Sequence, residues 1–433
     1  MTNFTRRRFL AENAMGVGTV ALAWLLRQDA ALAVPPVVAK NQVHHDLLPR
    51  SPQFAPRAEA MISLFQHGGP SHMDLTDPKP ELSKFDGTDY TGDIQYSFVN
   101  SASKKLLGSP WKFQKHGECG TELSELLPHT AEIVDDICLI RSMQTGANGH
   151  EVSIRYFHNG IPAALGRPTL GAWLVYALGC ESRDLPAYMV LTDPGGHPVD
   201  STHNWTNGFM PSMFQGTVLR PTEPRILNLD APSHLRGTLQ EQNLRLLGRL
   251  NERYLDEHPG EADLEARIAS YELAARMQTA ARDVLDLSQE TEATHKMYGL
   301  DDDATRDYGT RCLIARRLVE RGVRFVQLFL GGQPWDNHSS IKSSLPGICK
   351  TDRQAGRAWS KTSSSRGMLE TTLVQWGGEI GRLPVTQDQG RAPTRRAATI
   401  TARGFRVCGW PAAAFAAVTY GATDEVGHAP WKT

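Results

Sequence analysis

The sequence predicts an α/β protein, a three-layer α/β/α sandwich with a mainly parallel central sheet. Short apolar runs recur along the chain, each run ends in glycine and polar residues, and amphipathic helical patterns lie between the runs. Apolar runs without polar alternation are typical of strands buried on both faces, and strand–helix alternation produces parallel sheets. The chain has 433 residues, 40% of them hydrophobic, which is enough to bury a large core.

Five apolar runs are expected to form strands, and two segments between them are expected to form helices. The runs are 61–65, 137–140, 188–191, 323–330 and 373–376. The first helix covers Gly260 to Met297, with Leu264, Ile268, Tyr271 and Ala275 on one apolar stripe. The second covers about 308–320 and ends before Gly322, a plausible glycine just after a helix.

The first 33 residues have the pattern of an export signal. Arg6-Arg7-Arg8 is followed by an apolar stretch from Ala14 to Leu26 and by Ala31-Leu32-Ala33, a small-residue cleavage site. This order predicts export by the twin-arginine machinery, with a location in the periplasm or cell envelope and no stable membrane span after cleavage. An uncleaved membrane anchor is the alternative. Residues 34–433 are then expected to form a single domain.

The charge balance excludes nucleic acid as the main partner. The chain carries 46 Lys and Arg against 47 Asp and Glu, a formal net charge of −1. Nucleic-acid binding normally requires a basic face.

Polar side chains capable of binding a metal follow three of the predicted strands. Ligands bind α/β sheets at the carboxyl ends of the strands, so these side chains should meet at one edge. Histidine together with carboxylates is a normal ligand set for zinc, manganese or calcium at a hydrolytic site. Each residue alone could equally belong to a turn or to the core. The residues are His67, His72, Asp74, Asp336, His338 and Glu379.

Several motifs, taken together, resemble an exported bacterial family known as domain of unknown function 1501. The resemblance extends from Thr5 to about Val385 and includes the twin-arginine leader. That family is similar to the alkaline phosphatase and sulfatase superfamily, which implies an alkaline phosphatase-like fold and metal-centred hydrolysis of phosphate or sulfate esters. The motifs are 67–74, 77–80, 124–129, 141–143, 166–168, 333–338 and 376–382.

The resemblance also implies roles for individual residues. Asp336 and His338 resemble the central metal ligands, and Glu379 begins the next ligand motif. Asp74 or a neighbour resembles the first acidic ligand, His72 is a further candidate ligand, and the metal is expected to be zinc or calcium.

The nucleophile is expected in the segment from Thr145 to His150. No Cys-x-Pro-x-Arg sequence is present, so the formylglycine nucleophile of sulfatases is absent. Attack would come from a metal-bound water or from Thr145, with His150 as acid or base. A structural or substrate-loop histidine is the alternative for His150.

Two functions are consistent with these patterns. The first is an exported metal-dependent hydrolase of sulfate or phosphate esters, acting on a small-molecule or glycan ester. The second is a non-catalytic binding protein of the cell envelope with the same fold. Trp173, Trp205 and Trp335 would suit sugar stacking, although an isolated tryptophan usually belongs to the core.

Two stretches, 351–365 and 391–417, depart from the family pattern. In the first, Trp359 to Ser365 stands where the family pattern would have an amphipathic helix. A one-base shift in plausible codons for that helix would produce the sequence found here. In the second, no Asp or Glu occurs from Gln389 to Thr423, and a Gly-Arg-Asp-His motif that should supply the last metal ligand is missing. We therefore hypothesise compensating frame slips and a truncated C-terminal end. A diverged loop rich in alanine and arginine is the alternative.

The nucleotide sequence tests the frame-slip hypothesis directly. We expect single-base insertions or deletions flanking both stretches, and a restored frame that encodes the missing Gly-Arg-Asp-His motif. An undisturbed reading frame without such a restored motif would contradict the hypothesis.

Overall fold

The computed structural model describes residues 46–92, 102–145, 147, 149–161, 166–258, 261–338, 340–350, 358, 365–387, 397–401, 403–410 and 418–428. The chain divides into two units, 1–44 and 45–433, and all described residues belong to the second. The predicted export signal, 1–33, lies outside the described residues, as does most of the stretch 351–365. Within the described part of the chain, no helix is both long enough and apolar enough to cross a membrane.

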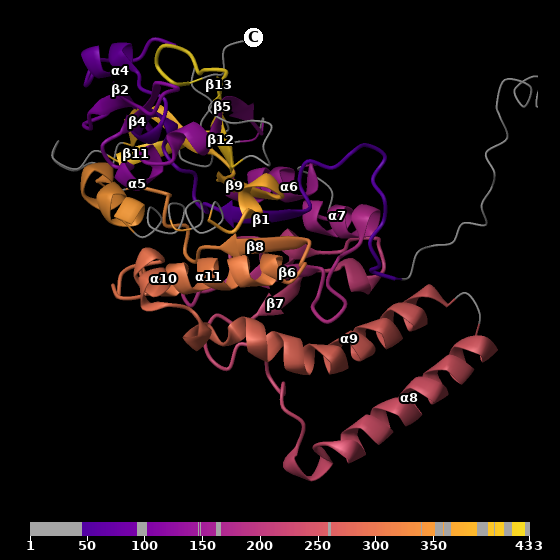
Figure 1. Ribbon diagram of the computed structural model, residues 1–433. Helices are drawn as coiled ribbons and strands as arrows, with labels where there is room; N and C mark the ends of the chain where they lie inside the picture. The colour runs from indigo at the N-terminus through magenta and orange to yellow at the C-terminus, as the bar shows by residue number, and fades with distance from the viewer. Residues whose placement is uncertain are drawn as a thin grey trace, which may run out of the picture. The chain divides into compact units, whose positions relative to one another are not determined.

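An eight-stranded sheet forms the centre of the second unit, in the order β13-β5-β12-β9-β1-β8-β6-β7 (Figure 1). β1 pairs in parallel with both β8 and β9, β8 with β6, and β6 with β7. The mainly parallel sheet predicted from the apolar runs is therefore confirmed. The strands are β1 (Ala60–Phe65), β5 (Cys138–Gln144), β6 (Tyr188–Leu191), β7 (Thr217–Leu219), β8 (Phe325–Phe329), β9 (Thr372–Gly377), β12 (Arg403–Trp410) and β13 (Val418–Tyr420).

β12 is the exception to the parallel arrangement. It lies between β5 and β9 and runs antiparallel to both. Its residues belong to the atypical stretch 391–417, where the sequence predicts no strand. Outside this sheet, two small antiparallel sheets join β2 (Ala102–Leu106), β10 (Gly381–Gln387) and β11 (Ala397–Thr401), and β3 (Phe113–His116) with β4 (Thr121–Ser124).

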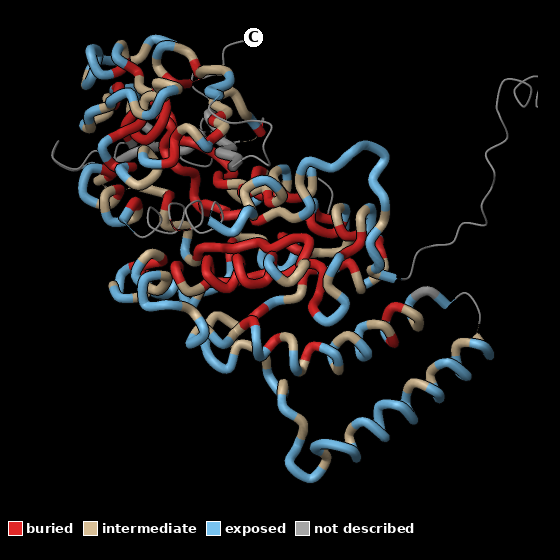
Figure 2. Tube along the Cα trace, viewed as in Figure 1, coloured by how far each residue is buried: buried red, intermediate tan, exposed pale blue. Residues whose placement is uncertain are grey.

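The central strands bury both faces, which explains why their sequences lack polar alternation. In β8, Val326 and Leu328 pack into one hydrophobic core, whereas Phe325 and Phe329 pack into a second core. Successive side chains of a strand point to opposite faces, so one apolar run supplies both cores. Figure 2 shows these strands as an almost continuous buried layer.

Helices cover both faces and complete the three-layer α/β/α sandwich. The core that contains Val326 also contains residues of α9 (Ala262–Leu285) and α11 (Arg306–Glu320). The core that contains Phe325 includes residues of α6 (His150–Asn159) and α7 (Leu170–Leu178). The shorter helices are α3 (His72–Leu75), α4 (Pro80–Lys84), α5 (Pro128–Ala131) and α10 (Glu292–Met297).

The predicted helix 308–320 is confirmed as α11, and Gly322 follows it with a φ of 81°. The single helix expected from Gly260 to Met297 is wrong, because the chain leaves α9 at Asp286 and starts again in α10. Ile268 of the predicted apolar stripe is buried, but Tyr271 is 69% exposed. The sequence analysis also did not predict helix α8 (Thr238–Glu257), which contains no buried residue.

A buried ion pair holds the segment that follows β13. The carboxylate of Asp77 accepts a hydrogen bond from the Thr423 hydroxyl at 2.6 Å and lies 3.0 Å from the Lys79 ammonium group. Lys79 in turn donates to the Thr423 carbonyl at 2.9 Å. Burial raises the pKa of Asp77, but Lys79 and other nearby groups outweigh this effect and hold the pKa below its usual value. The motif 77–80 therefore anchors the C-terminal segment.

Replacing Asp77 with Asn should reduce the free energy of unfolding by about 3 kcal/mol at neutral pH, because it leaves Lys79 buried without its counter-ion. The Asp77 pKa is depressed in the folded state, so the difference between wild type and variant should be present above about pH 4 and disappear as the pH falls further. Urea denaturation across this pH range measures both effects. Glu81→Gln, which removes an exposed pair with Lys84, is the control and should cost at most about 1 kcal/mol. Equal losses in both variants would contradict the assignment.

Candidate active site

The loops after β1 and β8 approach each other unusually closely. Gly68 has a φ of 109°, and a Cβ atom placed on it would lie 2.6 Å from the backbone nitrogen of Asp336. The backbone N–H of Trp335 donates to the carbonyl of His67 at 3.3 Å. Only glycine permits this approach, which places His67 beside Asp336.

Residues from four segments meet at this edge of the sheet. Nδ1 of His150, the first residue of α6, lies 2.6 Å from Oε1 of Glu379, and its Nε2 lies 3.4 Å from Oδ2 of Asp336. Nε2 of His338 contacts the same Asp336 oxygen at 2.8 Å. The backbone N–H of Gly68 donates to Glu379 Oε1 at 3.1 Å. We call His67, His150, Asp336, His338 and Glu379 the histidine–carboxylate cluster.

Opposite charges dominate the electrostatics of the cluster. Burial lowers the pKa of His150, but its contacts with Asp336 and Glu379 outweigh burial and raise the pKa to about 9. Burial raises the pKa of Asp336, but His150 and His338 outweigh it and hold that pKa below its usual value. Burial lowers the pKa of His67, and the nearby Glu379 only partly opposes this. At neutral pH the cluster therefore contains a protonated His150, an ionised Asp336 and a neutral His67.

Four buried polar atoms of the cluster lack hydrogen-bond partners of normal geometry within the described chain. They are both ring nitrogens of His67, Nε2 of His150 and Oδ1 of Asp336. His67 is 1% exposed, so bulk water cannot satisfy it. Buried polar groups are normally paired, and these atoms mark a position where a polar ligand or ion would be stabilised.

The cluster contains the types of atom that bind a metal, but these atoms are not arranged around one common metal position. Imidazole nitrogens and carboxylate oxygens are the ligands expected for zinc. However, among the residues that the structure describes, no group of three or more His, Cys, Asp or Glu side chains is arranged to hold a metal ion. The side chains of His150, Asp336 and Glu379 instead bind one another.

The structure brings together only part of the predicted site. Asp336, His338 and Glu379 lie in the cluster with His150. Asp74 instead forms a buried ion pair with Arg382 at 2.6 Å, and a ring nitrogen of His72 lies 2.8 Å from the carbonyl oxygen of Gly427. These contacts hold α3 against β10 and the C-terminal segment, and they do not direct either side chain toward Asp336.

Thr145 is engaged in local structure. It follows β5 and is buried, and its hydroxyl lies 3.1 Å from that of Ser153 and 3.3 Å from the carbonyl oxygen of Ala147. The contact with Ser153 joins the end of β5 to α6. Thr145 therefore helps to position His150, the first residue of that helix.

The sequence analysis names His67 only among several candidate metal ligands that follow strands and does not single it out. It also missed a chain of buried polar side chains in which Gln327 of β8 contacts Tyr188 and donates to Nδ1 of His158 at 3.0 Å. Burial lowers the pKa of His158 to about 3, so its ring is neutral. A glutamine inside the apolar run of β8 was the one available signal.

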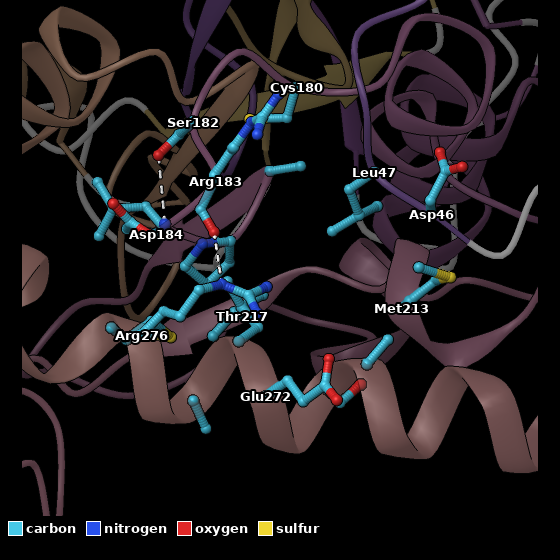
Figure 3. A pocket seen from close by; sticks show the side chains of 18 of the residues that line it. Asp46, Leu47, Cys180, Ser182, Arg183, Asp184, Met213, Thr217, Glu272 and Arg276 are labelled. Atoms are coloured by element: carbon cyan, nitrogen blue, oxygen red, sulfur yellow. Dashed lines mark hydrogen bonds between the residues drawn. The ribbon is translucent and has the colours of Figure 1, made fainter. Parts of the chain in front are cut away.

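A cavity of about 740 Å³ lies at the opposite edge of the sheet, where β6 and β7 begin (Figure 3). Its lining includes Ala187, Thr217 and Met277, and Arg276 donates to the carbonyl of Arg183 at its rim. Burial raises the pKa of the Cys180 thiol in this lining, which keeps the thiol protonated and unreactive. The cavity therefore contributes nothing to the chemistry of the cluster.

A family model described as "Protein of unknown function (DUF1501)" matches residues 58–433. The chain belongs to this family. No curated protein matches its sequence. Among solved structures, the PsFucS1 sulfatase from Pseudoalteromonas sp. is similar, with 10% sequence identity and a TM-score of 0.34. The match covers 86% of this chain and 66% of that sulfatase, slightly less than two thirds of its length.

The raised pKa of His150 predicts a specific titration. In protein prepared without metal, NMR of the histidine ring should show His150 protonated at pH 7, with a midpoint near 9. Because the folded pKa lies above the unfolded value of about 6.5, the associated stability should be complete below pH 6.5 and lost as the pH rises through 9. Glu379→Gln should shift the midpoint toward 6.5, whereas Glu151→Gln, the adjacent carboxylate, should leave it unchanged. A wild-type midpoint at or below 6.5 would contradict the electrostatic description.

Proposed function

We propose that this chain is built as an exported metal-dependent hydrolase of sulfate or phosphate esters, with the histidine–carboxylate cluster as its catalytic centre. The unpartnered, buried nitrogens of His67 beside the unpartnered Oδ1 of Asp336 carry this proposal. Both residues lie at the carboxyl edge of the sheet, where ligands of α/β proteins bind. The export signal predicted for residues 1–33 supports a location in the periplasm or cell envelope.

The charge of the cluster supports a requirement for a cation. Asp336 and Glu379 contribute two carboxylates to the cluster, and His150 and His338 both contact Asp336 Oδ2. A sulfate or phosphate ester is itself an anion, so these two carboxylates oppose its approach. A divalent cation such as zinc or calcium would offset their charge, and when bound it would polarise the ester and activate water.

The side chains of the chain have separate roles in this proposal. His67, Asp336 and His338 would hold the cation, and Glu379 would orient His150 through the 2.6 Å contact. His150, which is protonated at neutral pH in the metal-free protein, would act as a general acid toward the leaving oxygen. The local contacts of Thr145 favour water over this hydroxyl as the nucleophile.

We attribute the lack of three side chains arranged around one metal position, among the described residues, to the missing Gly-Arg-Asp-His motif. The family resemblance expects a further histidine ligand in the stretch 391–417, and this chain has no histidine there. Loss of one ligand from a site of three or four should cost most of the metal affinity, since changes behind the ligands alone cost 10- to 100-fold. We therefore expect weak metal binding and low activity on a small-molecule or glycan ester.

A non-catalytic binding protein of the cell envelope is the second candidate. One observation favours it: the 2.6 Å contact of His150 with Glu379 pairs this carboxylate with a histidine without a metal.

Metal content and turnover distinguish the two candidates. We expect the purified full chain, dialysed to equilibrium against excess zinc, calcium or manganese, to retain one of these metals while the free metal is present and to hydrolyse an aryl sulfate or aryl phosphate slowly. Asp336→Asn should lower both metal content and turnover by roughly 100-fold or more, because it removes the central carboxylate. Glu151→Gln is the matched control and should change neither.

Failure to retain any of the three metals, with the fold intact by circular dichroism, would contradict the hydrolase proposal. Turnover that survives Asp336→Asn would contradict the assignment of the cluster as the catalytic centre.

A further inference from the structure

Helix α8 exposes an apolar stripe along most of its length. Leu239, Leu246, Leu247, Leu250 and Tyr254 are each between 46% and 54% exposed. Their spacing of four and seven residues places them on one side of the helix. We call these five residues the α8 stripe. Figure 2 shows α8 as the most continuously exposed helix in that view.

The stripe does not face the neighbouring helix α9. Gln240 of α8 forms a 2.5 Å hydrogen bond with Gln278 of α9, and the half-buried positions of α8 are Gln240, Gly248, Asn251 and Leu255. On a helical projection these positions centre about 110° from the centre of the stripe. A soluble helix normally turns its apolar side to a partner, so the stripe is left without one among the described residues.

The charges of α8 are unsuited to an anionic membrane. The helix contains Glu241, Glu252, Asp256 and Glu257 against three arginines, and it has no lysine. Helices that lie on membranes are typically rich in lysine and arginine on the polar face. Two of the three arginines are also neutralised within the helix, since Arg245 pairs with Glu241 at 3.7 Å and Arg253 with Glu257 at 3.1 Å.

Most of the stripe is complementary to itself in an antiparallel arrangement. If two α8 helices cross midway between Leu246 and Leu247, Leu239 of one copy lies opposite Tyr254 of the other, and Leu246 lies opposite Leu247. Leu250 lies opposite Asn243, a polar residue on the same side of the helix. Arg253, which borders the stripe, then lies opposite the uncharged Gln240. A parallel arrangement would instead place Arg253 and Arg249 beside their own copies, and like charges in contact are unfavourable.

We propose that the α8 stripe is the contact surface between two copies of this chain, paired antiparallel about a two-fold axis. This goes beyond the proposed hydrolase function and does not depend on it. Five half-exposed large side chains bury roughly 100 Å² each, or about 1,000 Å² over both copies, which is near the lower limit for a specific interface. The pairing is therefore a reversible one, with a dissociation constant in the micromolar range.

Sedimentation equilibrium of the full chain, from about 1 to 100 µM, tests the proposal. The average mass of the wild type should rise from monomer toward dimer across this range. Leu246→Gln combined with Leu250→Gln should raise the dissociation constant at least about tenfold, since both substitutions remove apolar contact from the interface. Arg245→Gln combined with Glu252→Gln, on the other side of the same helix, is the matched control and should dimerise like the wild type. Circular dichroism should show equal helix content in all three.

Cross-linking tests the direction of the helices. A mixture of Leu239→Cys and Tyr254→Cys chains should form the mixed cross-link faster than either variant forms one with itself. A wild type that stays monomeric, or a control that weakens as much as the stripe variant, would overturn the proposal. So would stripe-dependent binding of a monomer to phosphatidylglycerol vesicles, which would assign the stripe to a membrane. None of these outcomes involves turnover, so failure here is distinct from failure of the hydrolase proposal.

Discussion

The position of β1 between β8 and β9 is the constraint on which the candidate site depends. Parallel pairing on both sides brings the carboxyl ends of three strands to one edge, although Met61 of β1 pairs with Phe325 of β8 and Ala60 of β1 pairs with Thr372 of β9, far along the chain. Gly68 then allows the loop after β1 to contact the backbone of Asp336, and it donates to Glu379. A side chain at position 68 would separate these loops and disperse the cluster.

The fold was largely predictable because its signal is local. An apolar run such as Phe325–Phe329 predicts a strand buried on both faces wherever it occurs, and strand–helix alternation then predicts the parallel sheet. β12 was not predictable for the same reason: it lies in a stretch rich in alanine and arginine without an uninterrupted apolar run. Its place in the sheet follows from pairing with β5 and β9, which is a tertiary effect.

The candidate site was only partly predictable, because strand ends indicate an edge but not which side chains meet there. Asp336, His338 and Glu379 meet as the strand order requires. Asp74 is the instructive contrast, since its position after β1 is equally suggestive, yet a buried arginine, Arg382, pairs with it. His67 could not be ranked above His72 from sequence alone, because the difference arises from the close approach at Gly68 and from which ring remains unpartnered.

We propose that a cation binds between the unpartnered atoms of His67 and Asp336. Anomalous X-ray scattering from crystals of the full chain soaked in zinc tests this binding site. Binding there predicts an anomalous peak within ligand distance of His67 Nε2 or Nδ1 and of Asp336 Oδ1, at about 2.0–2.2 Å. A peak at His72 and Asp74 instead, or no peak in the histidine–carboxylate cluster at a zinc concentration that saturates the protein in solution, would contradict it.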